Sequence, residues 1–137
     1  MSTLVWGIKA SLLAYARGMG GGDVQHEGVV KEPSGYAFPG TDGDGHTFSG
    51  SVRITAHGGI MDVTLADPAV VPDGDRWLLT VAGPAGADRL AVASIESLTE
   101  QDGFLVAAGT AMTAAGADLF AGPYGPGTPL DDPFIRP

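Results

Sequence analysis

The sequence predicts a mainly β, antiparallel fold, either a sandwich or a barrel, with two short α-helices, in one domain that spans residues 1–137. Two observations carry this prediction. Apolar and polar residues alternate with a period of two over much of the chain, and turn signals recur about every eight to twelve residues. The 22 glycines and 10 prolines fit as turn residues, because a chain with 44% hydrophobic residues has enough apolar surface to fold.

The first element departs from the strand pattern and is predicted as a helix over residues 8–17. This stretch is rich in good helix formers and is stopped by Gly18, and we interpret the glycine run from Gly18 to Gly22 as a flexible connector. On a helix, Ser11 and Tyr15 lie one turn apart on the same face. A hydroxyl and a phenol are therefore expected to point in the same direction.

The clearest β element is a hairpin formed by residues 51–67. Gly58 and Gly59 can adopt the positive φ angles of a two-residue hairpin loop, in which case His57 pairs with Ile60. This register places three aliphatic pairs on one face: Ala56 with Met61, Ile54 with Val63, and Val52 with Leu65. It places His57 at the end of a strand, beside the turn and on the opposite face.

The remaining elements follow from the same signals. A loop is expected over residues 38–45, and Thr113 is a suitable N-cap for a second helix that runs through Phe120. The tail after Gly122 is too rich in proline and glycine for regular structure. Three further strands are predicted over residues 76–82, 90–98 and 104–112.

Charge and composition exclude several classes of function. With 7 basic and 16 acidic residues the net charge is −9, which is opposite to what nucleic acid or an anionic membrane surface attracts. The absence of cysteine excludes disulfides, thiolate metal sites and cysteine catalysis. No apolar run is long enough for membrane insertion, and residues 1–6 show no export signal. We therefore expect a cytoplasmic protein as the sequence stands, or alternatively a domain excised from an exported protein.

Few residues remain as candidates for chemistry. The chain has 3 histidines, no serine in a nucleophile elbow and no phosphate-binding loop. Tyr15, Ser11, His57 and Tyr124 are the candidates. From residue type alone, Tyr15 is as easily explained as a core residue of an amphipathic helix, and His57 as a surface residue beside a turn.

Three motifs in order carry a resemblance to a known family. The first motif, at residues 6–15, is Trp-Gly-Ile-Lys-Ala-Ser-Leu-Leu-Ala-Tyr. The second motif covers residues 48–68 and contains Ala-His-Gly-Gly-Ile-Met-Asp-Val. The third motif, at residues 120–131, contains Phe, Tyr, Gly-Thr and Leu-Asp in that order. Together these motifs resemble the HtaA-type haem-binding domains, also called haem-transport-associated or conserved-region domains, of Gram-positive haem uptake.

This resemblance implies a two-sheet antiparallel β-sandwich that binds one ferric haem b in a groove partly open to solvent. The family's axial iron ligand corresponds to Tyr15, and the histidine that hydrogen-bonds the phenolate corresponds to His57. Ser11 and Tyr124 correspond to residues that contact the haem propionates. Phe120 and Ile60 are further candidate haem contacts. Because the chain is already negative, neutral donors or a cation such as Lys9 or Arg17 must hold the two propionates.

The resemblance favours a non-catalytic protein for haem acquisition, transfer or intracellular holding. An anionic oxygen ligand stabilises ferric iron, and a single protein ligand leaves the other haem face open to a receiving protein. The expected partners are haem and a second haem-carrier protein, and we expect a monomer or a weak homodimer. The alternative is a haem-free interaction module of the same fold. A haem enzyme is less favoured, because only His57 could act as an acid or base and it is already paired with the ligand.

Overall fold

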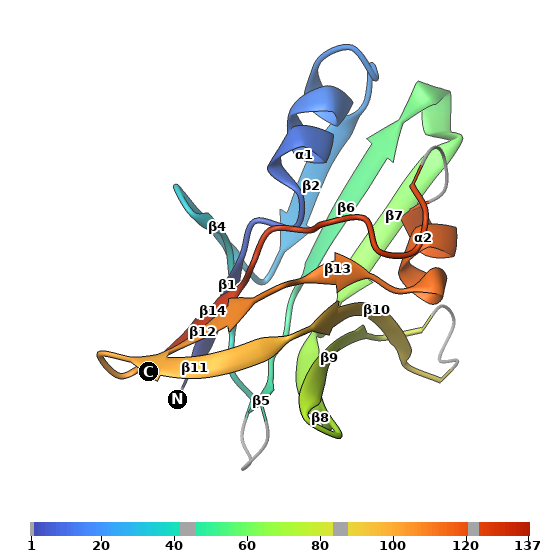
Figure 1. Ribbon diagram of the computed structural model, residues 1–137. Coiled ribbons are helices and arrows are strands. Elements are labelled where there is room, and N and C mark those ends of the chain that lie inside the picture. Colours follow the sequence, from blue (N-terminus) through green and yellow to red (C-terminus); the bar gives the residue numbers. More distant parts are fainter. Residues whose placement is uncertain (1, 42–45, 84–87, 121–123) are drawn as a thin grey trace.

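The computed structural model describes residues 2–41, 46–83, 88–120 and 124–137 (Figure 1). Its elements are mostly antiparallel strands with two short helices, so the mainly β class is confirmed. In the described part of the chain, backbone hydrogen bonds divide the strands among three sheets. No helix in these ranges has the length and apolar character that a membrane span requires.

The first sheet contains six strands and brings the two ends of the chain together. Its order is β11 (Ser97–Gln101), β12 (Phe104–Ala108), β14 (Phe134–Arg136), β1 (Thr3–Trp6), β4 (Gly35–Pro39) and β3 (Val30–Glu32). Two predictions are wrong here. The tail does form a strand, because Ile135 packs into the core while β14 pairs with both β1 and β12. Phe38 and Pro39 belong to β4, whereas residues 42–45 of the expected loop lie outside the described residues.

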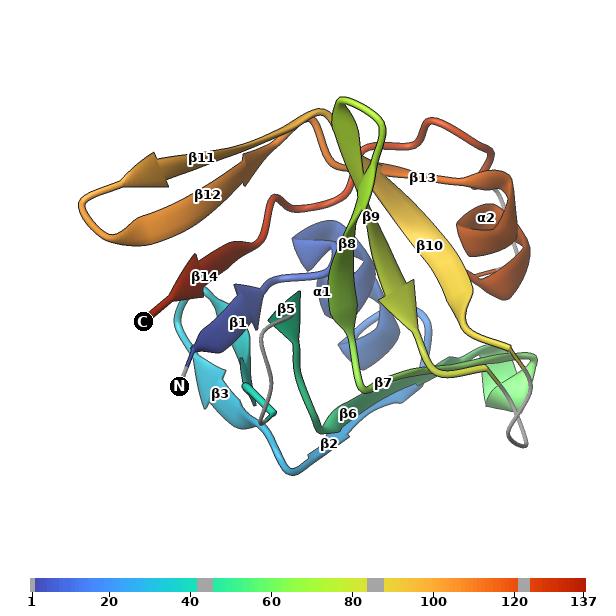
Figure 2. The same ribbon diagram turned by 90° about the horizontal axis from the view of Figure 1, so that it is seen from below.

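The second sheet contains five strands in the order β13 (Ala111–Met112), β10 (Leu90–Ile95), β9 (Arg76–Val81), β8 (Ala69–Asp73) and β5 (His46–Thr47). Strand β9 confirms the strand expected at residues 76–82. The single strands expected over 90–98 and 104–112 are wrong, because each is divided between this sheet and the first. The chain changes sheets at Glu96, whose N–H donates to Ala108, and at Gly109, which has φ +70°. Figure 2 shows the β11–β12 hairpin reaching out from the body of the molecule beyond this corner.

The third sheet, β2 (Asp23–Glu27), β6 (Ser51–Ala56) and β7 (Met61–Ala66), contains the predicted hairpin. The predicted register is confirmed, since its three aliphatic pairs are the observed partners and all six residues are buried. The predicted two-residue loop is wrong. Residues 57–59 form a 3₁₀ turn, so His57 does not pair with Ile60 as a strand residue. The reason lies outside the hairpin: the His57 N–H donates to the carbonyl of Gly20, 2.9 Å away.

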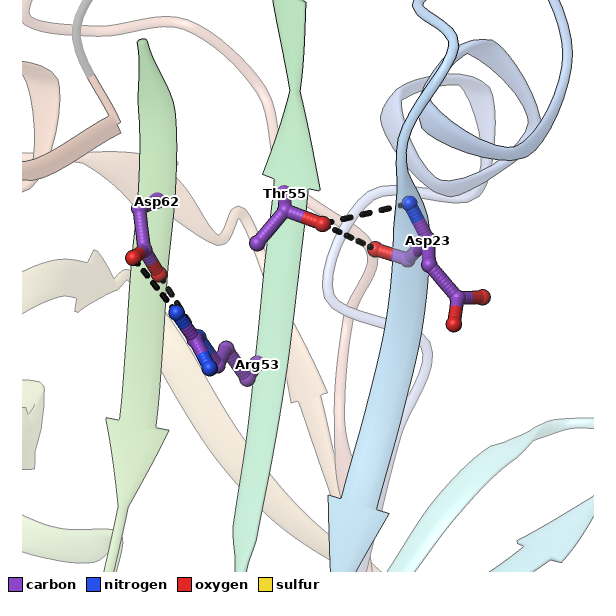
Figure 3. Close-up of polar contacts among 4 residues, drawn as sticks. All are labelled: Asp23, Arg53, Thr55 and Asp62. Carbon is purple, nitrogen blue, oxygen red and sulfur yellow. Dashed lines mark hydrogen bonds and ion pairs between the residues drawn. The ribbon is translucent and has the colours of Figure 1, made fainter. Parts of the chain in front are cut away.

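The solvent-facing side of the third sheet is held by polar side chains (Figure 3). Arg53 on β6 donates two hydrogen bonds, of 2.8 and 2.7 Å, to the carboxylate of Asp62 on β7. These bonds and the charge of Arg53 hold the pKa of the Asp62 carboxyl below its ordinary value. Thr55 on β6 accepts from the backbone N–H of Asp23 on β2 and donates to its carbonyl. The strand that leads to His57 is thus fixed on both sides.

Helix α1 (Ala10–Arg17) packs against β2 and β6. It begins two residues later than predicted, because Ile8 adopts a left-handed conformation with φ 61° that turns the chain from β1 into the helix. Asp131 stabilises this turn, since its N–H donates to the Ile8 carbonyl and its carboxylate accepts from the N–H of Ala10. The fully buried Ile8 side chain explains why an apolar residue occupies such a position.

Helix α2 (Ala114–Phe120) confirms the second predicted helix. The Thr113 hydroxyl accepts the N–H of Gly116 at 3.0 Å, which is the expected N-cap interaction. A Cβ atom at Gly116 would overlap the carbonyl oxygen of Val92, so glycine allows α2 to lie close against β10. The core between the helices and sheets contains five fully buried aromatic residues: Trp6, Tyr36, Phe38, Phe48 and Phe120.

Candidate ligand-binding site around Tyr15 and His57

The structure brings together the phenol of Tyr15 and the imidazole of His57, which are 42 positions apart in the sequence. Tyr15 Oη and His57 Nε2 are 2.9 Å apart, and the two rings are tilted by 50° with their centroids 5.5 Å apart. The side chains remain accessible, since Tyr15 is 39% exposed and His57 is also exposed. A phenol oxygen hydrogen-bonded to a basic nitrogen therefore faces solvent at the end of the molecule where α1 and the β6–β7 hairpin meet.

Helix α1 positions Tyr15 through its amphipathic pattern. Leu12, Leu13 and Ala16 are buried against the sheets, and this fixes the rotation of the helix about its axis. Ser11 and Tyr15, four residues apart, then fall on an exposed face, as their spacing predicts. The Ser11 hydroxyl is thus available on the same helix face as the phenol.

The turn at residues 57–59 positions His57. Its backbone has φ 53°, a left-handed conformation that is uncommon for residues other than glycine, and Gly58 follows with φ 65°. The connector after α1 is ordered by its own hydrogen bonds, because Gly20 and Gly22 donate to the carbonyls of Tyr15 and Ala16. It is a compact loop that reaches the His57 backbone.

Tyr124 lies close enough to Tyr15 for the two phenols to interact electrostatically. Burial raises the pKa of the Tyr124 phenol above its ordinary value of 10.0, and the neighbouring Tyr15 raises it further. The side chain also packs partly against the core. Tyr124 therefore remains a neutral hydroxyl at physiological pH and can donate a hydrogen bond to an anionic group.

Two large apolar side chains that are close in sequence to Tyr15 and His57 are exposed to solvent. Ile60, three residues after His57, is 87% exposed, and Met19, in the loop after α1, is 93% exposed. Met19 follows Tyr15 in the chain and Ile60 follows His57. The two segments that contain them are joined by the hydrogen bond between Gly20 and His57. Met19 is not among the residues predicted from the sequence, where its only distinguishing feature is its position as an apolar residue within a run of glycines.

The other predicted residues have contacts of their own in the fold. Phe120 is fully buried at the end of α2 and contributes to the core. Lys9 donates to the Pro129 carbonyl at 3.1 Å, and Arg17 donates to the Tyr36 hydroxyl at 2.7 Å. Among the described residues, no three histidine or acidic side chains gather into a site for a bare metal ion.

Comparisons with known proteins identify the family and support the fold. Residues 1–134 match the HtaA family, described as Htaa. The C-terminal domain of HtaA from Corynebacterium glutamicum is 25% identical with a TM-score of 0.82, over 98% of this chain and 93% of that one. The N-terminal domain of the same protein is 24% identical with a TM-score of 0.78, over 98% and 94%. The haem-binding protein HtaB from C. glutamicum is 20% identical with a TM-score of 0.75, over 98% and 95%. The comparison with curated proteins gives no significant match.

Proposed function

This chain belongs to the HtaA family, and we propose that it is a non-catalytic protein that binds one ferric haem b with Tyr15 as the protein ligand of the iron. The observation that carries this proposal is the 2.9 Å contact between Tyr15 Oη and His57 Nε2. The name of its structural relative HtaB, a haem-binding protein, supports the choice of ligand.

The donor set suits a ferric porphyrin. An anionic phenol oxygen is a hard ligand that favours ferric over ferrous iron, and Tyr15 presents its oxygen to solvent. The bound haem supplies a Lewis-acidic iron with an open coordination position. No other side chain of the described residues combines a phenol in reach of solvent with a basic nitrogen at hydrogen-bond distance.

His57 acts as the proton acceptor for the ligand. In the imidazole tautomer with its hydrogen on Nδ1, Nε2 accepts the hydrogen of the Tyr15 hydroxyl. Ligation requires the phenol to lose its proton, and Nε2 lies 2.9 Å away to receive it. The resulting imidazolium donates back to the phenolate and keeps its charge balanced.

Residues near Tyr15 and His57 would contact the propionates and the macrocycle of the haem. Ser11 and the neutral Tyr124 phenol donate hydrogen bonds to the propionates without adding charge. The exposed side chains of Ile60 and Met19 would supply apolar contacts to the macrocycle. With Tyr15 as the single protein ligand, the haem could pass to a second carrier protein. This role is haem acquisition, transfer or holding.

Hemin titration of the purified protein tests the proposal. The wild type should give a Soret band and the weak charge-transfer band of a high-spin ferric phenolate. Tyr15→Phe should lose the charge-transfer band and bind hemin at least about tenfold more weakly, and His57→Ala should weaken binding as well. A matched control is His26→Ala, which changes the same residue type on β2 and should leave the spectrum unchanged.

Three outcomes contradict parts of this proposal. If wild-type protein leaves the hemin spectrum unchanged, the chain is the haem-free interaction module instead. If Tyr15→Phe gives the wild-type spectrum and affinity, another group ligates the iron. Peroxide turnover clearly above that of free hemin contradicts the non-catalytic assignment.

A further inference from the structure

We propose that Gly20 is a positioning residue for the Tyr15–His57 pair. Its peptide groups form a backbone bracket that joins the main chains of both residues and sets the distance between phenol and imidazole. The functional part of this inference rests on the proposed haem site. The bracket itself is a property of the free protein and can be tested without haem.

The bracket consists of two backbone hydrogen bonds. The N–H of Gly20 donates to the carbonyl of Tyr15 at 2.8 Å, and the carbonyl of Gly20 accepts from the N–H of His57 at 2.9 Å. Gly20 is buried, so its polar backbone groups need partners within the protein, and both partners are the proposed site residues. With the side-chain contact between Tyr15 and His57, these bonds close a ring of three hydrogen bonds.

The reason for glycine at this position is space. Gly20 is not among the residues with positive φ, so its backbone conformation suits other residues. A Cβ atom built on Gly20 would lie 3.0 Å from Cε2 of the Tyr15 ring, 3.0 Å from the Tyr15 carbonyl oxygen and 3.2 Å from Cδ2. Any side chain here would therefore press on the ring of the proposed ligand.

The same loop is also fixed against the strand that leads to His57. A Cβ atom at Gly22 would overlap the carbonyl oxygen of Thr55, and the Gly22 N–H donates to Ala16 at 2.8 Å. The loop therefore connects the end of α1 to the end of β6 in a single geometry. Because an exposed phenol and imidazole would otherwise rotate freely, this connection orients the pair before a ligand arrives.

The bracket also supports the unusual backbone of His57. With φ 53°, His57 has a left-handed conformation that persists only where surrounding contacts stabilise it. The bond from the His57 N–H to Gly20 is such a contact, and it comes from outside the hairpin. Displacing Gly20 should thus alter both the ring of Tyr15 and the backbone that presents His57.

The variants Gly20→Ala and Gly21→Ala separate this role from general loop stability. Gly21 has φ +64° and a Cβ there would contact nothing within 4 Å, so Gly21→Ala strains the same loop without touching Tyr15. Thermal unfolding establishes that both variants fold. With hemin bound, Gly20→Ala should weaken or shift the phenolate charge-transfer band and release haem to excess apomyoglobin about tenfold faster. Gly21→Ala should leave band and rate close to wild type.

Retention of the wild-type band and release rate in Gly20→Ala overturns the proposal, as do equal changes in both variants. A measurement on the unaltered free protein covers the case in which Gly20→Ala does not fold. Amide hydrogen exchange should be slower at His57 than at the neighbouring exposed Gly58 and Gly59. An unprotected His57 amide refutes the bracket. Failure of the wild type to bind hemin refutes the proposed function instead, and the exchange measurement then still decides whether the bracket exists.

Discussion

His57 stores backbone strain that a pair of substitutions can reveal. Its φ of 53° lies in the left-handed region, where a residue with a Cβ atom is disfavoured by about 1–2 kcal/mol. His57→Ala removes the hydrogen bond to Tyr15 but keeps the strain. His57→Gly removes both. Because both variants lack the imidazole, the difference in their unfolding free energies contains only the strain and the difference between glycine and alanine in the unfolded chain.

The expected difference can be estimated from opposing effects. Relief of the left-handed conformation favours glycine by about 1–2 kcal/mol, and the greater freedom of the unfolded glycine chain disfavours it by about 0.4–1 kcal/mol. The Cβ of residue 57 is exposed, so its loss removes little buried surface. We expect His57→Gly to be more stable than His57→Ala by about 0.5–1 kcal/mol, although neither variant keeps the proposed proton acceptor.

Urea unfolding of the free variants, followed by circular dichroism, measures this difference. Glu27 provides the control, since it is an exposed residue of β2 without positive φ. There, glycine should be less stable than alanine by about 0.5–1 kcal/mol. If alanine is favoured over glycine at position 57 as it is at position 27, the left-handed conformation of His57 carries no strain and the reasoning is wrong.

Two further predictions concern the parts of the fold that support the site. The lowered pKa of Asp62 contributes stability above its unfolded value of 3.8, and this contribution is lost as pH falls through the lower folded value. Acid unfolding of Asp62→Asn should therefore show a smaller pH dependence than wild type below pH 4, and an unchanged slope contradicts the Arg53–Asp62 interaction. Thr113→Ala should destabilise the protein by about 1 kcal/mol through loss of the α2 N-cap, while Thr99→Ala on β11 should have a smaller effect in the same urea unfolding assay.

The hairpin shows how far a local pattern can predict structure. Because side chains alternate with a period of two, only one register puts Val52, Ile54 and Ala56 opposite their aliphatic partners, and that register is observed. The turn was predicted wrongly because the His57 N–H bonds to Gly20, which is distant in sequence. A pattern within the hairpin contains no information about that partner.

The strands around Glu96 and Gly109 show a second limit. Their alternation continues through the corner, so residues 90–98 look like one strand although they belong to β10 and β11 in different sheets. The period of side chains is the same in every sheet, and therefore cannot indicate where the chain passes from one to another. Strand β14 was missed for a related reason, since its three residues are stabilised by neighbours on both sides.

The sequence by itself determined the β class, the hairpin register, both helices and the exposed helix face that carries Ser11 and Tyr15, because these follow from periodicity and capping between near neighbours. Resemblance to a family, rather than spacing, singled out His57. Only the tertiary structure decided that Tyr15 Oη and His57 Nε2 lie 2.9 Å apart, that Tyr124 lies near Tyr15, and that the carbonyl of Gly20 accepts from the His57 N–H. These facts depend on backbone hydrogen bonds between distant segments. Every residue but proline offers such bonds, so residue identities alone do not reveal them.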